Sequence, residues 1–444
     1  MFIRCPEYIN TAFRLLEQSG FKAYAVGGCV RDSLLGKTPD DWDMTTSSTP
    51  EETMEVFKDF RVIPTGIKHG TVTVIIDGNH IEITTMRVDG EYHDSRRPDN
   101  VQFTSDVEKD LSRRDFTVNA MAYNHTDGLI DTFGGQEDLK NKTIRCVGNP
   151  NKRFNEDALR IIRALRFACV LDFEIDKETA ESIINNVSLI NNVANERIRV
   201  ELMKLLQGVA VERILTDFKE IIFEIIPDLR RLDGFAQNTP YHIYDIWNHT
   251  VKVVSNVKNT PVLRLAALLH DISKPDCFKS DSKGIAHFKG HPEQSSKMSV
   301  DILKGLRFSN KEIDIVSTII KLHDMYPDGN KTSVAKYCSL YSPETLKLTL
   351  ELMRGDTAGK NPAFQKKQYD SYDLAEKQID EIVESNLCLK VSDLAVKGED
   401  ISNLGFKGRD IGETLNALLS MVIQEEIENN KGVLLDTATK LKNN

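Results

Sequence analysis

The sequence predicts an α+β protein, in which a mixed sheet with helices forms the amino-terminal third and helices alone form the rest. Up to about residue 150, short runs of β-branched residues alternate with segments of helical periodicity. Beyond that point, Leu and Ile recur at three- and four-residue spacing to the end of the chain. The 444 residues also exceed what one hydrophobic core usually organises, so several domains are expected.

The elements of the first third follow from local patterns. An amphipathic helix is expected at residues 7–19, followed by a strand at Ala23–Val26 and a helix after the turn Gly27–Gly28. Residues 71–76 and 81–86 are rich in β-branched side chains and flank an Asp-Gly pair, which predicts a β-hairpin.

The next helix is expected to begin at Asn155, whose side chain suits an N-cap, with Glu156 and Asp157 in its first turn. Three arginines follow at three-residue steps and form a spiral band: Arg160, Arg163 and Arg166. Turn residues then interrupt the helical pattern at 227–240 and 357–362. The expected domains are residues 1–150, 151–240, 241–360 and 361–444.

Composition excludes several classes of protein. A net charge of -10 argues against indiscriminate binding to nucleic acid. The chain has no uncharged apolar run that could span a bilayer and no apolar leader, so we expect a cytoplasmic protein without a membrane partner. Seven scattered cysteines without a CxxC pair fit a reducing compartment and argue against a cysteine zinc site.

Asp41 and Asp43 are the first candidate site. Two residues apart on an extended strand, they point to the same face, where two carboxylates can share a hard cation such as Mg²⁺. A solvated acidic turn after Pro39 is the alternative. Glu82 is a third acidic candidate, because alternation sends it to the face opposite Ile81 and Ile83, but its role stays open.

Gly27–Gly28 and Arg31 form the second candidate, because backbone N–H groups before a helix and a guanidinium suit a phosphate. A simple tight turn is the alternative. Asp157 and Arg160 form the third. Cytosine and adenine each offer an amine donor beside a ring-nitrogen acceptor, so a carboxylate beside a guanidinium favours them over guanine and uracil. A helix decorated with salt links is the alternative here.

Four motifs in order resemble the class II tRNA nucleotidyltransferases, that is, the CCA-adding enzymes and their bacterial poly(A) polymerase relatives. They are GGCVRD at 27–32, DDWDMTT at 40–46, LSRRDFTVNAMAY at 111–123 and NEDALRIIRALRFA at 155–168. The resemblance implies a nucleotidyltransferase head of the DNA polymerase β superfamily, followed by a helical neck, body and tail that hold tRNA.

The resemblance also implies a reaction: template-independent addition of CCA to the 3′ end of tRNA from CTP and ATP, with Mg²⁺ on Asp41 and Asp43 and release of pyrophosphate. It assigns base reading to Asp157 and Arg160. It assigns other nucleotide contacts to Gly28, Arg31, Arg114, Asp115, Asn119, Arg163 and Arg166. The alternatives are an enzyme that adds only the terminal A, and a poly(A) polymerase, although residues 64–70 lack the basic pair usual in the latter.

The polar segment 87–99 has no buried face and predicts a mobile loop. In family members limited to adding CC this segment is typically shortened, so its full length favours addition of the final A.

Six of the ten histidines fall between residues 242 and 323. The pattern resembles the HD superfamily of metal-dependent phosphohydrolases. The resemblance implies a transition-metal site formed by His249, His270, Asp271, His291, His323 and Asp356. An alternative function follows, namely an HD phosphohydrolase whose head only binds RNA. A retained helical scaffold with packing histidines is the other possibility.

Overall fold

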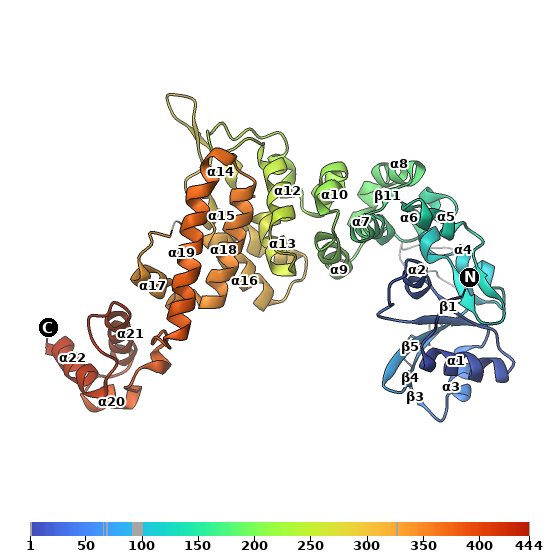
Figure 1. The fold of residues 1–444 in the computed structure, drawn as a ribbon, viewed down its shortest axis with the longest axis horizontal. Coiled ribbons are helices and arrows are strands. Elements are labelled where there is room, and N and C mark those ends of the chain that lie inside the picture. Colours follow the sequence, from blue (N-terminus) through green and yellow to red (C-terminus); the bar gives the residue numbers. More distant parts are fainter. Residues whose placement is uncertain (1, 65, 68–69, 91–100, 326, 444) are drawn as a thin grey trace. The chain divides into compact units, whose positions relative to one another are not determined.

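The computed structural model describes residues 2–64, 66–67, 70–90, 101–325 and 327–443. The chain divides into two compact units, Met1–Pro227 and Asp228–Asn444, and each is considered by itself (Figure 1). Most of the segment 87–99, for which a loop is predicted, lies outside the described residues.

A seven-stranded sheet forms the first part of the amino-terminal unit, in the order β3-β4-β5-β2-β1-β8-β9. Neighbouring strands are antiparallel except β2 and β5, which run parallel, so the sheet is mixed as predicted. The strands are β1 Ala23–Val26, β2 Asp43–Thr46, β3 Arg61–Ile63, β4 Thr71–Ile76, β5 Asn79–Thr85, β8 Ala122–Asn124 and β9 Gly128–Ile130. Four smaller strands stand apart: β6 Arg87–Asp89 pairs with β7 Val101–Phe103, and β10 Thr143–Ile144 pairs with β11 Glu174–Ile175.

The predicted hairpin is confirmed. Asp77 and Gly78 have φ values of 50° and 79°, and two consecutive positive φ angles match the right-handed twist of the strands on either side. β5 begins directly at Asn79, so the turn is two residues shorter than the sequence pattern indicates. Helices α1 Glu7–Gln18 and α3 Pro50–Val56 pack on this sheet, and α3 begins with a capping box formed by Thr49 and Glu52.

The predicted cap at Asn155 is wrong. Asn149 caps α6 instead, accepting from the Lys152 N–H, and Pro150 occupies the first helical position, so this pair supplies the stronger start signal. The helix then ends at Glu156, and Asp157 adopts an extended backbone with φ -145° before α7 begins at Leu159.

The remaining helices of the amino-terminal unit surround and follow the sheet. They are α2 Gly28–Leu34, α4 Val107–Ser112, η2 Thr117–Asn119, α5 Gly135–Lys140, α6 Pro150–Glu156, α7 Leu159–Leu171, α8 Lys177–Asn185, η3 Val187–Asn192, α9 Asn195–Leu206, α10 Val211–Asp217 and α11 Lys219–Ile225. Helices α7 and α9 pack against each other, which brings residues about forty positions apart into contact.

The carboxy-terminal unit is helical, as predicted, apart from the short pair β12 Lys279–Ser280 and β13 Ala286–His287. One group of helices comprises α12 Ile246–Asn256, α13 Pro261–Leu269, α14 Lys274–Cys277, α15 His291–Gly305, α16 Asn310–Leu322 and α18 Pro343–Ala358. The others are α17 Lys331–Tyr341, η5 Pro362–Phe364, α19 Gln365–Glu384, η6 Val391–Asp393, α20 Gly398–Asn403, α21 Arg409–Ile423 and α22 Lys431–Asn443, with η4 Pro227–Leu232 at the junction of the units. No helix within the described ranges is both long and apolar enough to cross a membrane.

Candidate functional site

Asp41 and Asp43 lie at the start of β2 on the face that the alternation predicts. Trp42, between them, is only 3% exposed, whereas both aspartates have exposed side chains. Buried Trp42 fixes the pleat, so the two carboxylates are held toward the same side.

Glu82 joins these aspartates, which the sequence left open. Its Cα is the register partner of Asp43 in the parallel pair of β2 and β5, while Ile81 and Ile83 beside it are buried. Desolvation by the surrounding protein and the negative charges of Glu82 and Asp41 together raise the pKa of Asp43 to about 6, although Arg114 lowers it in part. The three carboxylates therefore meet at the end of the sheet where β2 begins, with Glu82 midway along β5.

The glycine turn lies at this same end of the sheet. Val26, the last residue of β1, is the register partner of Asp43, and Gly27 follows with a φ of 78° that favours glycine. A Cβ at Gly27 would lie 3.1 Å from Nη1 of Arg114. The absent side chain thus leaves room for the Arg114 guanidinium beside the first turn of α2.

A polar network links the first, third and fourth motifs. Nη1 of Arg31 donates to the side-chain oxygen of Asn119 at 2.7 Å, and Asn119 donates to Asp115 at 3.3 Å. Asp115 accepts two bonds from Arg163, at 2.6 and 2.9 Å. Burial alone would raise the pKa of Asp115, but Arg163 lowers it to about 2, so this carboxylate is ionised.

Phe167, which the sequence reasoning missed, lies beside three of the arginines predicted to contact the nucleotide. The guanidinium carbons of Arg166, Arg31 and Arg163 lie 3.8, 5.2 and 5.3 Å from the centre of its ring. An aromatic face offers guanidinium groups a partner that does not neutralise them. Burial lowers the pKa of Arg166 to about 10, so a buried positive charge is maintained here at a cost.

The side chains of Asp157 and Arg160, the two predicted base-reading residues, are not paired with each other. Arg160 donates to Glu156 at 2.9 Å and to the carbonyl of Arg113 at 2.8 Å. Asp157 instead pairs with Arg197 of α9, at 2.8 and 3.3 Å. Each residue is therefore held by its own partners.

In the carboxy-terminal unit, the six predicted HD residues come together around Asp271. One carboxylate oxygen, Oδ1, lies 3.3 Å from Nε2 of His291 and 3.7 Å from that of His323. The other, Oδ2, lies 3.1 Å from Nε2 of His270 and 3.6 Å from that of His249. Asp356 completes the cluster, with its Oδ1 2.9 Å from Nε2 of His249. Two sets of three donor atoms result, and both include Asp271.

The histidine rings are oriented by backbone carbonyls. Each ring directs Nδ1 to a carbonyl oxygen, at 3.2 Å for His249, 2.8 Å for His270, 2.9 Å for His291 and 2.6 Å for His323. If Nδ1 carries the proton, Nε2 keeps its lone pair and faces the cluster, which is how metal-binding histidines are usually held.

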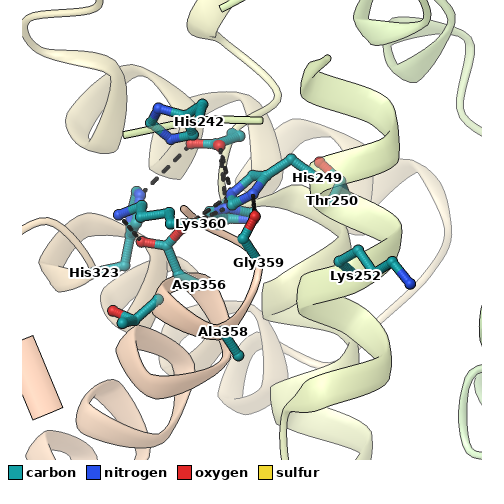
Figure 2. A network of polar contacts seen from close by, with 12 residues as sticks. His242, His249, Thr250, Lys252, His323, Asp356, Ala358, Gly359 and Lys360 are labelled. Carbon is teal, nitrogen blue, oxygen red and sulfur yellow. Dashed lines mark hydrogen bonds and ion pairs between the residues drawn. The ribbon is translucent and has the colours of Figure 1, made fainter. Parts of the chain in front are cut away.

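Two lysines balance the carboxylates. Nζ of Lys274 lies 2.6 Å from Asp271, and Nζ of Lys360 lies 2.6 Å from Asp356, as Figure 2 shows for the second pair. Burial alone would raise the pKa of Asp271 and Asp356, but neighbouring histidines and these lysines hold both well below the usual range. A cavity of about 360 Å³ opens onto Asp271, His291, His323 and Asp356. Burial lowers the pKa of His242, which also lines this cavity, to about 2.

Comparison with known proteins identifies the class. Residues 23–145 match the family described as Poly A polymerase head domain, 172–229 match the RNA and SrmB-binding site of polymerase A, and 278–438 match tRNA nucleotidyltransferase domain 2. The three carboxylates of Asp41, Asp43 and Glu82 and the arginines around Phe167 agree with these matches. Together they define the chain as a nucleotidyltransferase, a class of enzyme that works with a divalent metal.

The chain belongs to the CCA-adding enzymes, the family that adds CCA to the 3′ end of tRNA. It is 33% identical to a CCA-adding enzyme of Lactobacillus helveticus, over 97% of this chain and 94% of the relative. It is also 47% identical to a CCA-adding enzyme of Enterococcus faecalis, over 49% of this chain and 53% of the relative.

Solved structures agree with this placement. A crystal structure of the Bacillus stearothermophilus CCA-adding enzyme in complex with CTP matches with a TM-score of 0.71 and 26% identity, over 98% of this chain and 97% of that one. A Thermotoga maritima CCA-adding enzyme complexed with tRNA has the same fold, with a TM-score of 0.58 and 21% identity, over 99% of this chain and 97% of that one.

Proposed function

We propose that this chain adds C, C and A in turn to the 3′ end of tRNA, taking CTP and ATP in one site without a nucleic-acid template. The observation that carries the proposal is the strand register of Val26, Asp43 and Glu82. Because of it, the glycine turn that suits a phosphate and the carboxylates that suit a cation lie at one end of neighbouring strands.

Asp41 and Asp43, together with Glu82, would hold Mg²⁺. Their donor set fits this ion, since carboxylate oxygens are the ligands that hard divalent cations prefer. The pKa of Asp43 near 6 leaves its carboxylate mostly ionised at neutral pH and ready to accept a cation. When bound, the ion would neutralise phosphate charge and favour the ionised form of the attacking hydroxyl.

The triphosphate would bind to the N–H groups near Gly28 and to four arginines: Arg31, Arg114, Arg163 and Arg166. Asp115 and Asn119 would orient Arg163 and Arg31 through the hydrogen bonds described above. Such a preorganised set of donors need not rearrange as charge develops during the reaction.

Asp157 and Arg160 would read the base. The carboxylate of Asp157 accepts from the exocyclic amine, and Arg160 donates to the ring nitrogen. Cytosine and adenine present this amine beside an unprotonated ring nitrogen, whereas uracil and guanine present a carbonyl beside a ring N–H. The 3′ oxygen of tRNA then attacks the α-phosphorus in line, and pyrophosphate leaves from the opposite side. The residues of the chain position the base and the triphosphate and supply the positive charges that face the phosphates.

Incubation with tRNA that lacks CCA and with each labelled nucleotide tests the proposal. Two additions from CTP followed by one from ATP are expected. Addition of a single A to tRNA ending in CC, without any C addition, would indicate an A-only enzyme. A long A tail would indicate a poly(A) polymerase. No incorporation of any nucleotide would overturn the proposal.

The carboxy-terminal cluster supports a second candidate function, a transition-metal site with phosphohydrolase chemistry. Imidazoles and a shared carboxylate suit such an ion. Nε2 of His270 and both carboxylate oxygens of Asp271 are buried and make no well-aligned hydrogen bond within the described part of the chain. Release of phosphate from a nucleotide monoester, lost together with the bound metal, would support hydrolysis. Bound metal without release would leave the cluster a structural site.

The four-part division at residues 150, 240 and 360 also remains a proposal. The ends of the matched families at 145, 229 and 278 support the divisions near 150 and 240, whereas the family matched at 278–438 runs across residue 360. The cytoplasm is the proposed compartment, and the seven free cysteines, of which six are buried thiols, are compatible with it.

A further inference from the structure

We infer that Arg197 is a positioning residue that sets nucleotide selectivity by fixing the carboxylate of Asp157. The inference rests on the proposed role of Asp157 in reading the base. The sequence gives no local sign of it, because forty residues and a different helix separate the two.

The carboxylate of Asp157 is held in place by other residues, because Asp157 itself lies outside a helix. It lies in the break between α6 and α7, with an extended φ of -145°. Arg197 is on α9, which packs on α7, and its guanidinium binds both carboxylate oxygens: Nη1 to Oδ1 at 3.3 Å and Nη2 to Oδ2 at 2.8 Å. The N–H of Leu159 also donates to Oδ1, at 3.1 Å. This forked contact holds the carboxylate in one plane.

The contacts leave one position for a ligand. A carboxylate has about four lone-pair sites. Arg197 and Leu159 use both sites on Oδ1, and Arg197 uses one on Oδ2, so among the described residues one site on Oδ2 stays open. That single acceptor matches the one amine N–H that cytosine or adenine presents on its pairing edge.

A fixed carboxylate matters because the residue types alone do not exclude the wrong bases. Uracil and guanine have a ring N–H beside a carbonyl. A carboxylate free to shift along the edge could accept from that N–H while Arg160 donates to the carbonyl. With the carboxylate held opposite the exocyclic group, uracil and guanine instead place a carbonyl oxygen against it, which leaves buried polar groups unpaired.

Arg160 is held in the same manner, by Glu156 and by the carbonyl of Arg113. Both halves of the base-reading pair are therefore fixed, and selectivity depends on Arg197 as the fixing group for the carboxylate.

The test compares kcat/KM for all four nucleotides on tRNA lacking CCA, for the wild type, Arg197→Gln, Arg197→Lys and Asp157→Ala. The control is Arg213→Gln. Arg213 is as exposed as Arg197, at 26% against 27%, and it too pairs with acidic side chains, those of Asp172 and Glu174, neither of which has a proposed role in the site. Thermal unfolding of each variant accompanies the kinetics.

For Arg197→Gln, the preference for CTP over UTP should fall about tenfold or more, as expected for the loss of a charge-assisted forked contact. Arg197→Lys should lie between it and the wild type, and Arg213→Gln should keep full selectivity. If Arg197→Gln keeps the preference, or loses activity with all four nucleotides equally, the inference is wrong. If Asp157→Ala also keeps it, the base-reading role itself fails.

Discussion

Asp43 and Glu82 are register partners in the one parallel pair of the head sheet, although thirty-nine positions separate them along the chain. Their side chains share a face, and the charge of Glu82 contributes to the raised pKa of Asp43. Replacing Glu82 with Gln should therefore lower the pKa of Asp43 and raise the Mg²⁺ concentration needed for half-maximal addition. A Mg²⁺ titration of CTP incorporation measures this. An unchanged midpoint would remove Glu82 from the cation site.

Asp41→Asn and Asp43→Asn should each abolish nucleotide addition while tRNA binding stays near that of the wild type. Each change removes the charge of a proposed metal ligand with little change in volume. Incorporation assays and a tRNA filter-binding assay distinguish the two effects. Addition at near wild-type rate in either variant would contradict the assignment.

Asp157→Ala should lose discrimination more than affinity, because the arginines around Phe167 would still hold the triphosphate. Incorporation of all four nucleotides, with the apparent KM for CTP, measures both. Continued strong rejection of UTP and GTP would contradict selection by this side chain.

Asp115 should make the amino-terminal unit sensitive to acid. Its pKa is about 2 in the folded protein, against 3.8 for a free carboxyl, so the folded state favours the ionised form. This stabilisation is complete above about pH 5 and is lost as the pH falls from about 4 to 2, a decrease of roughly 2 kcal/mol.

Urea unfolding followed by the fluorescence of Trp42, in a Trp247→Phe background, isolates this unit, because the chain has only two tryptophans. Between pH 5 and pH 3 the free energy of unfolding should decrease less in Asp115→Asn than in the parent. Equal decreases would mean that the Arg163 pair contributes nothing to acid stability.

The histidine cluster should bind at least one transition metal per chain. After dialysis, elemental analysis of the wild type should detect the ion, and the double variant His270→Ala plus Asp271→Ala should lack it. An exposed His–Asp pair, His287 with Asp281 at 3.1 Å, gives a matched double-alanine control that should keep the ion. Negligible metal in every sample would make the cluster structural.

Local sequence patterns predicted much of the fold and part of the candidate site. Alternation around Trp42 and around Ile81 predicted the faces of Asp43 and Glu82, and the Asp-Gly pair predicted the hairpin turn. The pairing of β2 with β5 could not be predicted in this way, because a parallel pair depends on contacts between segments distant in sequence.

The same limit applies to the helix that carries the base-reading residues. The sequence pattern predicts a cap at Asn155, whereas the helix is capped by Asn149 and begins with Pro150, a start signal that this prediction did not consider. The contact between Asp157 and Arg197 depends on how α7 and α9 pack, so no local pattern around either residue could reveal it.

The two oxygens of Asp271 face different histidine pairs, with Oδ1 toward His291 and His323 and Oδ2 toward His249 and His270. Two metal ions would not bind to this cluster independently of each other. The first would draw electron density from the shared carboxylate and repel the second, so the binding isotherm would show one tight equivalent and one weaker equivalent. Negative cooperativity would thus follow from a single aspartate that belongs to both donor sets.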